Sequence, residues 1–224
     1  MSKTALVTGS NRGIGLQFCS QLKQRGFDVI ATCRTASAEL KSLDVEIIED
    51  VEVSDPVSLQ ALADKLAGRQ IDWLINNAGI AGGLGLSDID VAAVESFKRQ
   101  YEVNSLGPLL TTQILSGNLA SGSKVGLVTS RMGSMADNDS GGSYAYRMSK
   151  AALNAAGKSL SIDLKPQGIA VGILHPGWVR TDMTGHGGLI DTDESVDGLL
   201  KRMDELNLEN SGTFWHTNGE VLPW

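Results

Sequence analysis

The chain has 224 residues, of which 42% are hydrophobic and 20% are charged, and this composition excludes a disordered protein and fits a single folded domain. Its net charge of −7, without any cluster of lysines or arginines, excludes a non-specific nucleic-acid surface. No stretch approaches the ~18 apolar residues of a membrane span, and no signal peptide fits before Ala5, so we expect a cytoplasmic protein whose Cys19 and Cys33 are reduced.

Short apolar segments alternate along the chain with longer segments of helical period. Most of the short segments are apolar at nearly every position, which is typical of parallel strands covered on both faces. In chain order we predict strands at Thr4–Thr8, Asp28–Thr32, Val45–Ile48, Trp73–Asn76, Lys124–Thr129, Ala170–Leu174 and, from a weaker signal, Thr213–His216.

The intervening segments carry helix start and stop signals. Asp55 suits an N-cap before Pro56, and Pro166 and Gly168 are stop signals. We predict helices at Ile14–Arg25, Pro56–Leu66, Tyr146–Leu164 and Ser195–Leu206, and two helices within Ala92–Leu119 separated near Gly107-Pro108.

This alternation predicts an α/β fold in which residues 1–224 form one Rossmann-type domain. The expected architecture is a doubly wound sheet of about seven mostly parallel strands flanked by helices. In such sheets the ligand lies at the carboxyl ends of the strands, near the topological switch point. We therefore expect the functional residues directly after the predicted strands.

A glycine-rich turn joins the first predicted strand to the first predicted helix, with the sequence Thr8-Gly9-Ser10-Asn11-Arg12-Gly13-Ile14-Gly15. Glycines allow the backbone to turn sharply and to approach a pyrophosphate closely, and the helix N-terminus adds free N–H groups. Such a turn can also be an ordinary tight turn, but its place between a strand and a helix favours dinucleotide binding.

The second predicted strand is followed by Arg34, where an NAD-binding unit would place a carboxylate for the ribose 2′-hydroxyl. Arg34 and Arg12 suit a 2′-phosphate instead, because guanidinium groups bind phosphate oxygens in pairs. We therefore expect NADP(H), although each arginine could also be a solvated surface residue. Asp50 and Val51, after the third strand, either hold the adenine amino group or belong to an exposed acidic loop.

Tyr146 and Lys150 are four residues apart, so they lie on one helical face, one turn from each other. Carbonyl reduction needs a hydride at carbon and a proton at oxygen, and a tyrosine can donate that proton if its phenolate is stabilised. A lysine charge ~4 Å away at an effective dielectric of ~20 contributes about 4 kcal/mol, whereas burial raises the phenol's pKa. The spacing also arises by chance, so this hypothesis depends on the neighbouring NADP site.

In combination these motifs resemble those of the short-chain dehydrogenase/reductases, from Thr4 to the C-terminus. The segments 175–183 and 219–224 are further similar to the sniffer and C-factor group of carbonyl reductases. The matching motifs, in order, are Thr8–Gly15, Asn76-Asn77-Ala78-Gly79, Asn104, Ser130, Tyr146 with Lys150, and Pro176-Gly177 through Thr181.

The resemblance implies roles for the matched residues. Tyr146 would be the general acid/base, Lys150 would lower its pKa and hold the nicotinamide ribose, and Ser130 would bond the substrate oxygen. Asn104 would keep a helix locally open and bind a water that relays protons to Lys150. No metal is expected. The cofactor contacts would be Gly9, Asn11, Arg12, Gly13, Ile14, Gly15, Arg34, Asp50, Val51, Asn77, Ala78, Gly79, Tyr146, Lys150, Pro176, Gly177, Val179 and Thr181.

Ser130 lies 16 residues before Tyr146, which is farther than in many members of the family. The extra residues fall at 136–142, in a loop that can bulge without moving its ends. Ser130 is the preferred substrate-binding serine because it directly follows the fifth strand, and Ser134 is the alternative.

The segment at residues 178–197 corresponds to the family's substrate lid. Its glycines at 185, 187 and 188 suggest mobility, and Trp178, Met183 and Leu189 offer apolar surface. The expected substrates are small aromatic or aliphatic ketones, aldehydes or quinones. His186 is interpreted as an exposed loop histidine.

An NADP-dependent carbonyl reductase is the favoured function. The alternatives are an NADP(H)-binding signalling or sensor module with little turnover, and an NAD-linked alcohol dehydrogenase. The resemblance also implies a homodimer or homotetramer, formed through the helix near Asn104–Leu119 and the helix that starts at Tyr146.

Overall fold

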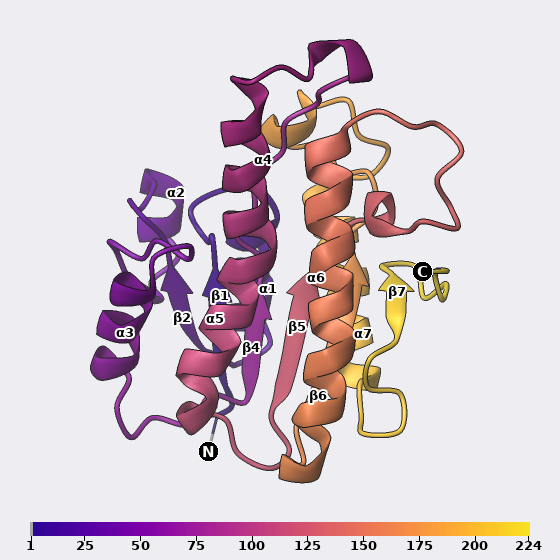
Figure 1. The fold of residues 1–224 in the computed structure, drawn as a ribbon. Helices are drawn as coiled ribbons and strands as arrows, with labels where there is room; N and C mark the ends of the chain where they lie inside the picture. Colours follow the sequence, from indigo (N-terminus) through magenta and orange to yellow (C-terminus); the bar gives the residue numbers. More distant parts are fainter. Residues whose placement is uncertain (1) are drawn as a thin grey trace.

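All seven predicted strands are present in one sheet in a computed structural model that describes residues 2–224 (Figure 1). Neighbouring strands pair in parallel in the order β3-β2-β1-β4-β5-β6-β7. The doubly wound sheet is thus confirmed, and it is parallel throughout rather than mostly parallel. The strands are β1 (Thr4–Thr8), β2 (Asp28–Thr32), β3 (Glu46–Ile48), β4 (Trp73–Asn76), β5 (Lys124–Val128), β6 (Ala170–His175) and β7 (Phe214–His216).

Helices cover both faces of the sheet, and each face has its own hydrophobic core. Ala5 and Val7 of β1 pack with residues of α1 and α7, whereas Leu6 packs with residues of α3 and α6. In Figure 1, α1 and α7 lie behind the sheet and α3 to α6 lie in front. The helices are α1 (Gly13–Gln24), α2 (Ala38–Lys41), α3 (Pro56–Lys65), α4 (Ala93–Tyr101), α5 (Gly107–Ile114), α6 (Tyr144–Asp163) and α7 (Thr192–Glu205).

The short helix α2 lies in a segment for which the sequence pattern predicts no helix. Four residues are too few for a helical period to become visible. The helix starts at a local cap, because the Leu40 N–H donates to the Ser37 hydroxyl at 3.1 Å.

The long helical segment holds two helices, as predicted, and α5 begins at Gly107-Pro108, but the two helices are joined by a helical turn rather than separated by a break. Helix α4 continues into α5 through a π-helical turn at Glu102–Leu106, in which the Gly107 N–H donates to the carbonyl of Glu102, five residues earlier. Pro108 has no N–H and cannot bond the carbonyl of Asn104, four residues before it. The wider turn accommodates the proline without ending the helix, so the local opening falls at Asn104, as the resemblance implied.

The predicted lid segment, residues 178–197, consists of a loop and the first turns of α7. An isolated bridge between Val179 and Ile190 closes the loop, which contains the 3-10 helix η6 (Asp182–Thr184). Helix α7 begins at Thr192, and its Ser195 is fully buried. The loop itself therefore ends before residue 192.

Both cysteines are buried and free, as expected. Burial raises the pKa of the Cys19 thiol to about 11, so it remains protonated at neutral pH. Within residues 2–224, the helices are all too short or too polar to cross a membrane.

Candidate active site

The carboxyl ends of the strands surround a cavity of about 630 Å³. The chain continues from β1 to β2 on one side of the sheet and later returns to β4 on the other side, so the switch point lies between β1 and β4. This is where open α/β sheets bind their ligands. Of the predicted site residues, the cavity wall includes Gly9, Asn11, Arg12, Gly13, Ile14, Gly15, Arg34, Val51, Asn77, Ala78, Gly79, Tyr146, Lys150, Pro176 and Thr181.

The turn after β1 depends on its glycines. Gly9 and Gly13 have φ values of 68° and 54°, in the left-handed region that favours glycine. A Cβ atom on Gly15 would lie 2.2 Å from the Gly9 carbonyl oxygen and 2.6 Å from Nδ2 of Asn77. The turn and the N-terminus of α1 can therefore pack this closely only with glycine at position 15.

Asn77, directly after β4, holds this turn in place. Its Nδ2 donates to the Thr8 carbonyl at 3.0 Å and to the Gly9 carbonyl at 3.2 Å. The Thr8 hydroxyl in turn accepts hydrogen bonds from the N–H groups of Asn77 and Ala78. The motif after β4 thus fixes the switch point, a role that the resemblance did not imply.

The two arginines expected at the 2′-phosphate both line the cavity and both face carboxylates. Arg12 Nη1 lies 3.1 Å from Oδ2 of Asp182 in η6. Arg34 Nη1 lies 3.9 Å from Oε2 of Glu52. Both guanidinium groups are largely exposed, so they are accessible to a ligand that enters the cavity.

Glu52 is a residue of the cavity wall that the sequence analysis did not identify. It accepts hydrogen bonds from the Ser54 hydroxyl at 2.9 Å and from Arg99 Nη2 at 3.0 Å. Burial raises the pKa of Glu52, but the Ser54 hydrogen bonds and the charge of Arg99 outweigh burial and lower it overall. Arg99 is 47 residues away on α4, so no local pattern could reveal this pair.

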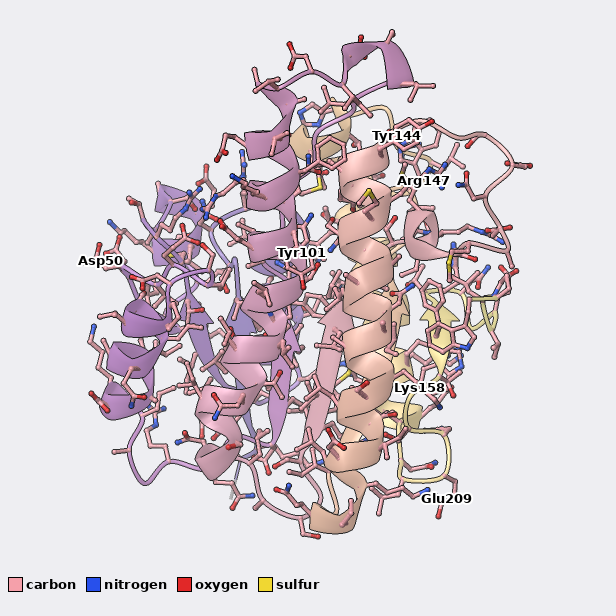
Figure 2. All side chains as sticks on the ribbon, viewed as in Figure 1. Asp50, Tyr101, Tyr144, Arg147, Lys158 and Glu209 are labelled. Atoms are coloured by element: carbon pink, nitrogen blue, oxygen red, sulfur yellow. The ribbon has the colours of Figure 1, made fainter. Side chains whose placement is uncertain are left out.

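The remaining predicted residues lie outside the cavity wall. Asp50 is exposed with a φ of 63°, and Figure 2 shows it at the edge of the molecule. Gly177 has a φ of 87° and packs against Ile190, and Val179, which forms a bridge with Ile190, is buried. These positions shape the loops around the cavity. The set outside the wall is Asp50, Asn104, Ser130, Gly177 and Val179.

Tyr146 reaches the cavity from the first turns of α6 and meets Ser130, which follows β5 after one residue. Burial raises the pKa of the Tyr146 phenol, and a side-chain hydrogen bond with Ser130 only partly opposes this, so the pKa is raised overall. The expected net lowering by Lys150 is therefore not found, because burial dominates. The phenol is protonated at neutral pH.

Ser130 rather than Ser134 meets the tyrosine. Ser134 lies beyond the 3-10 helix η4 (Arg131–Gly133), and its hydroxyl accepts the N–H of Asp137 at 3.1 Å. The additional loop before α6 is held by Arg147, whose side chain donates to the Gly141 and Gly142 carbonyls at 3.2 Å (Figure 2). This loop therefore extends outward from α6 without displacing Ser130.

Lys150 lies one turn below Tyr146, with Nζ 5.9 Å from the centre of the tyrosine ring. Its ammonium group donates to the Val128 carbonyl at 3.0 Å. Burial lowers the pKa of Lys150 to about 8. At pH 7 roughly nine in ten molecules still carry the charge, so a buried cation stands beside the phenol.

Asn104, in the π-helical turn, is fully buried and lies near Lys150 of α6. Its Nδ2 donates to the Ile80 carbonyl at 2.8 Å and to the Ser149 hydroxyl at 3.0 Å, and its Oδ1 accepts the Ile80 N–H at 2.8 Å. A Cβ atom on Gly79 would lie 3.3 Å from that Oδ1 and 3.7 Å from Nζ of Lys150. The segment after β4, the π-helical turn and Lys150 therefore meet at one point.

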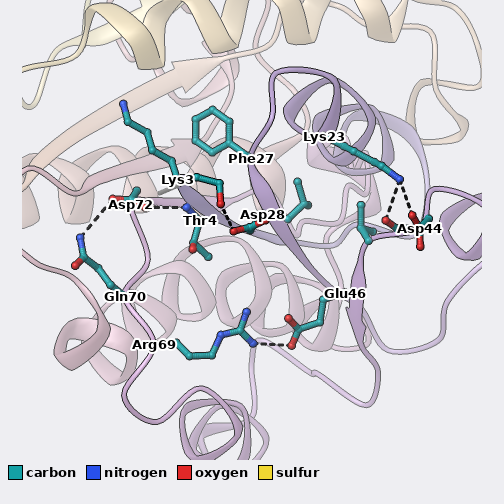
Figure 3. Close-up of a pocket in the computed structure, with 13 residues that line it drawn as sticks. Lys3, Thr4, Lys23, Phe27, Asp28, Asp44, Glu46, Arg69, Gln70 and Asp72 are labelled. Atoms are coloured by element: carbon teal, nitrogen blue, oxygen red, sulfur yellow. Dashed lines mark hydrogen bonds and ion pairs between the residues drawn. The ribbon is translucent and has the colours of Figure 1, made fainter.

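A larger cavity, of about 770 Å³, lies at the opposite edge of the sheet, around the starts of β1 to β4 (Figure 3). Its charged side chains pair with one another: Arg69 lies 2.7 Å from Glu46, and Lys23 lies 3.2 Å from Asp44. It is remote from Tyr146 and from the glycine-rich turn. The smaller cavity, which contains both, is therefore the candidate active site.

Comparison with known proteins reveals close similarities along the whole chain. The short chain dehydrogenase family matches residues 3–188. The chain is 40% identical over 227 residues to 1-hydroxy-2-glutathionyl-2-methyl-3-butene dehydrogenase of Rhodococcus sp. (strain AD45), with 99% of each chain covered. It is 46% identical over 169 residues to C-signal of Myxococcus xanthus. That match covers 74% of this chain and 100% of C-signal.

Two carbonyl reductases of known structure have the same fold. The NADPH-bound carbonyl reductase from chicken fatty liver is 33% identical, with a TM-score of 0.87 and coverage of 100% of this chain and 99% of that chain. The carbonyl reductase Sniffer of D. melanogaster is 28% identical, with a TM-score of 0.91 and full coverage of both chains.

Proposed function

The chain belongs to the short-chain dehydrogenase family, and from that premise we propose that it uses NADPH to reduce a ketone, aldehyde or quinone to the alcohol, with Tyr146 as general acid. The observation that carries this proposal is the arrangement of Tyr146, Ser130 and Lys150 at the end of a cavity that begins with a glycine-rich turn. Together these groups can accept a dinucleotide and donate a proton.

The residues of the cavity fit NADP(H). The close packing at Gly15 leaves the backbone of the turn open to a pyrophosphate, and α1 adds the N–H groups of its first turn. Arg12 and Arg34 are the cations for a 2′-phosphate. NADPH is also the cofactor of the chicken carbonyl reductase. When bound, it supplies the hydride.

Tyr146 donates the proton that the carbonyl oxygen needs. Because its pKa is raised, the phenol holds that proton at neutral pH, which is the state required for reduction. Ser130, hydrogen-bonded to the same phenol, orients the substrate oxygen toward it. The protonated phenol is therefore the form from which carbonyl reduction starts.

Lys150 stabilises the phenolate that Tyr146 becomes after it has donated its proton. Its buried ammonium group, with no carboxylate partner among the described ion pairs, is available to that negative charge. Both side-chain N–H bonds of Asn104 donate to protein groups, so a water relay would use its main-chain carbonyl, which Pro108 cannot bond.

The loop before α7 is the proposed substrate lid. Trp178, Met183 and Leu189 are exposed on it, and Met183 also lines the cavity. Apolar side chains beside a proton donor suit aromatic or aliphatic carbonyl compounds better than charged ones.

The test is NADPH consumption with a panel of ketones, aldehydes and quinones. We expect turnover by the native protein and a ~10²–10⁴-fold loss in Tyr146→Phe, with NADPH binding unchanged. Tyr144→Phe, on the same helix turn, is the matched control and should remain active. Normal turnover by Tyr146→Phe would remove the proposed acid.

A signalling or sensor role is the second candidate, and the similarity to C-signal favours it. Such a protein would bind NADPH and show no turnover with any compound of the panel. The same experiment therefore separates the two functions.

We also propose self-association into a homodimer or homotetramer through the face formed by α4, α5 and α6. Tyr101 and Met148 are large and exposed on α4 and α6, which pack against each other (Figure 1). Light scattering on the purified protein measures the assembly directly, and a monomer at all concentrations contradicts it.

A further inference from the structure

The loop before α7 contacts the glycine-rich turn through one ion pair. Asp182 Oδ2 lies 3.1 Å from Nη1 of Arg12, although the two residues are 170 positions apart. Next to this pair, a Cβ atom on Gly13 would lie 3.5 Å from Cγ2 of Thr181. The lid and the turn therefore meet at the cavity wall, to which all four residues belong.

Arg12 is also one of the two cations assigned to the 2′-phosphate of NADP(H). An arginine whose charge faces a carboxylate binds a phosphate less favourably, because the phosphate must displace the carboxylate or share the guanidinium group with it. Asp182 and the 2′-phosphate therefore compete for the guanidinium group of Arg12.

The corresponding pair at Arg34 is different. Glu52 lies 3.9 Å from Arg34 but is hydrogen-bonded to Arg99 and Ser54 at 3.0 and 2.9 Å, so its carboxylate has other partners. Asp182 also lies 3.3 Å from Nε2 of His186, on its own loop. Of the two arginines, Arg12 is therefore the one whose availability to a phosphate depends on a carboxylate of the lid.

We propose that Asp182 helps to set cofactor preference by competing with the 2′-phosphate of NADP(H) for Arg12. This inference rests on the proposed NADP(H) site. NADP(H) draws Arg12 away from the lid, whereas NAD(H), which has no 2′-phosphate, leaves the pair of Arg12 and Asp182 in place. The lid carboxylate thus weakens NADPH binding relative to NADH binding.

The size of the effect follows from exposure. The side chains of Arg12 and Asp182 are 70% and 58% exposed, so their ion pair has the modest strength of a surface pair. Asp182→Asn should therefore increase the ratio of the NADH Kd to the NADPH Kd by about two- to fivefold. Repulsion between the carboxylate and the pyrophosphate, which both cofactors carry, cancels in this ratio.

The experiment measures both dissociation constants by fluorescence titration for the native protein, Asp182→Asn, Arg12→Ala and the double variant. The ratio should rise in Asp182→Asn, and Asp182→Asn should have no further effect on it in the Arg12→Ala background. Asp191→Asn is the matched control, because Asp191 pairs with Arg180 at 3.0 Å in the same loop but lies outside the cavity wall. Asp182→Ala provides a second substitution that removes the carboxylate, and thermal unfolding verifies that each variant is folded.

A ratio that stays unchanged or falls in both Asp182→Asn and Asp182→Ala overturns the proposal, and so does a rise that persists in the Arg12→Ala background. Failure of the proposed function has a different signature, because the native protein would then bind neither cofactor or would reduce no carbonyl compound. NADPH preference without any effect of Asp182 refutes this inference alone.

Discussion

The substitution Lys150→Met should have two effects: it should stabilise the folded protein, and it should abolish turnover. The ammonium group is buried, its pKa is lowered from 10.5 to about 8, and its described hydrogen bond is to the Val128 carbonyl. At 1.36 kcal/mol per pKa unit, the difference between 10.5 and about 8 corresponds to about 3 kcal/mol of unfolding free energy lost through burial of the charge. Loss of the hydrogen bond costs about 1 kcal/mol, so the variant should gain about 2 kcal/mol at pH 7.

The sign of the pH dependence follows from the two pKa values. Below pH 8 the lysine is charged in both states, and the folded state carries the full burial cost. Between pH 8 and 10.5 the unfolded chain binds more protons than the folded protein, so the stability contributed by Lys150 rises with pH. The advantage of Lys150→Met over the native protein should therefore shrink through this window.

The assay is urea unfolding of the native protein and Lys150→Met at pH 7 and at pH 10, with Lys158→Met as the exposed control on the same helix. The free-energy difference between Lys150→Met and the native protein isolates Lys150, because all other groups titrate in both. Two results would refute the reasoning: a Lys150→Met variant less stable than the native protein at pH 7, or a free-energy difference that is the same at both pH values. Either would show that burial of the Lys150 charge does not lower the stability of the folded protein.

Three further substitutions test the cavity. Arg34→Asp should weaken NADPH binding at least tenfold more than NADH binding in fluorescence titrations, and equal weakening would make the arginine structural. Gly15→Ala places a methyl group 2.2 Å from a carbonyl oxygen, so NADPH affinity and Tm should both fall, whereas Gly117→Ala, with no atom within 4 Å, should change neither. Ser130→Ala should lower kcat about 10- to 100-fold and Ser134→Ala should not, and the reverse result would exchange their roles.

The sheet and the turn could be predicted from the sequence because their signals are local. The predicted bounds Thr4–Thr8, Asp28–Thr32 and Trp73–Asn76 are those of β1, β2 and β4, since a strand buried on both faces is apolar at almost every position. The resemblance to the sniffer and C-factor group, drawn from short motifs, is confirmed by the similarity to Sniffer and to C-signal.

Other features depend on contacts that no local pattern records. The carboxylates beside the two arginines, Glu52 and Asp182, become visible only when the strand ends are brought together. Gly107-Pro108 is a strong stop signal and predicts a break, but the π-helical turn before it carries the helix across the proline. The raised pKa of Tyr146 depends on how deeply the phenol is buried, which is a property of the folded protein.

The most direct test of the central claim is a crystal structure of the protein with NADPH. We predict that the adenosine 2′-phosphate meets Arg34 and that the nicotinamide ring lies beside the hydroxyl groups of Tyr146 and Ser130. A dinucleotide bound in the cavity at the opposite edge of the sheet, or a nicotinamide ring out of reach of the Tyr146 hydroxyl, would contradict the claim.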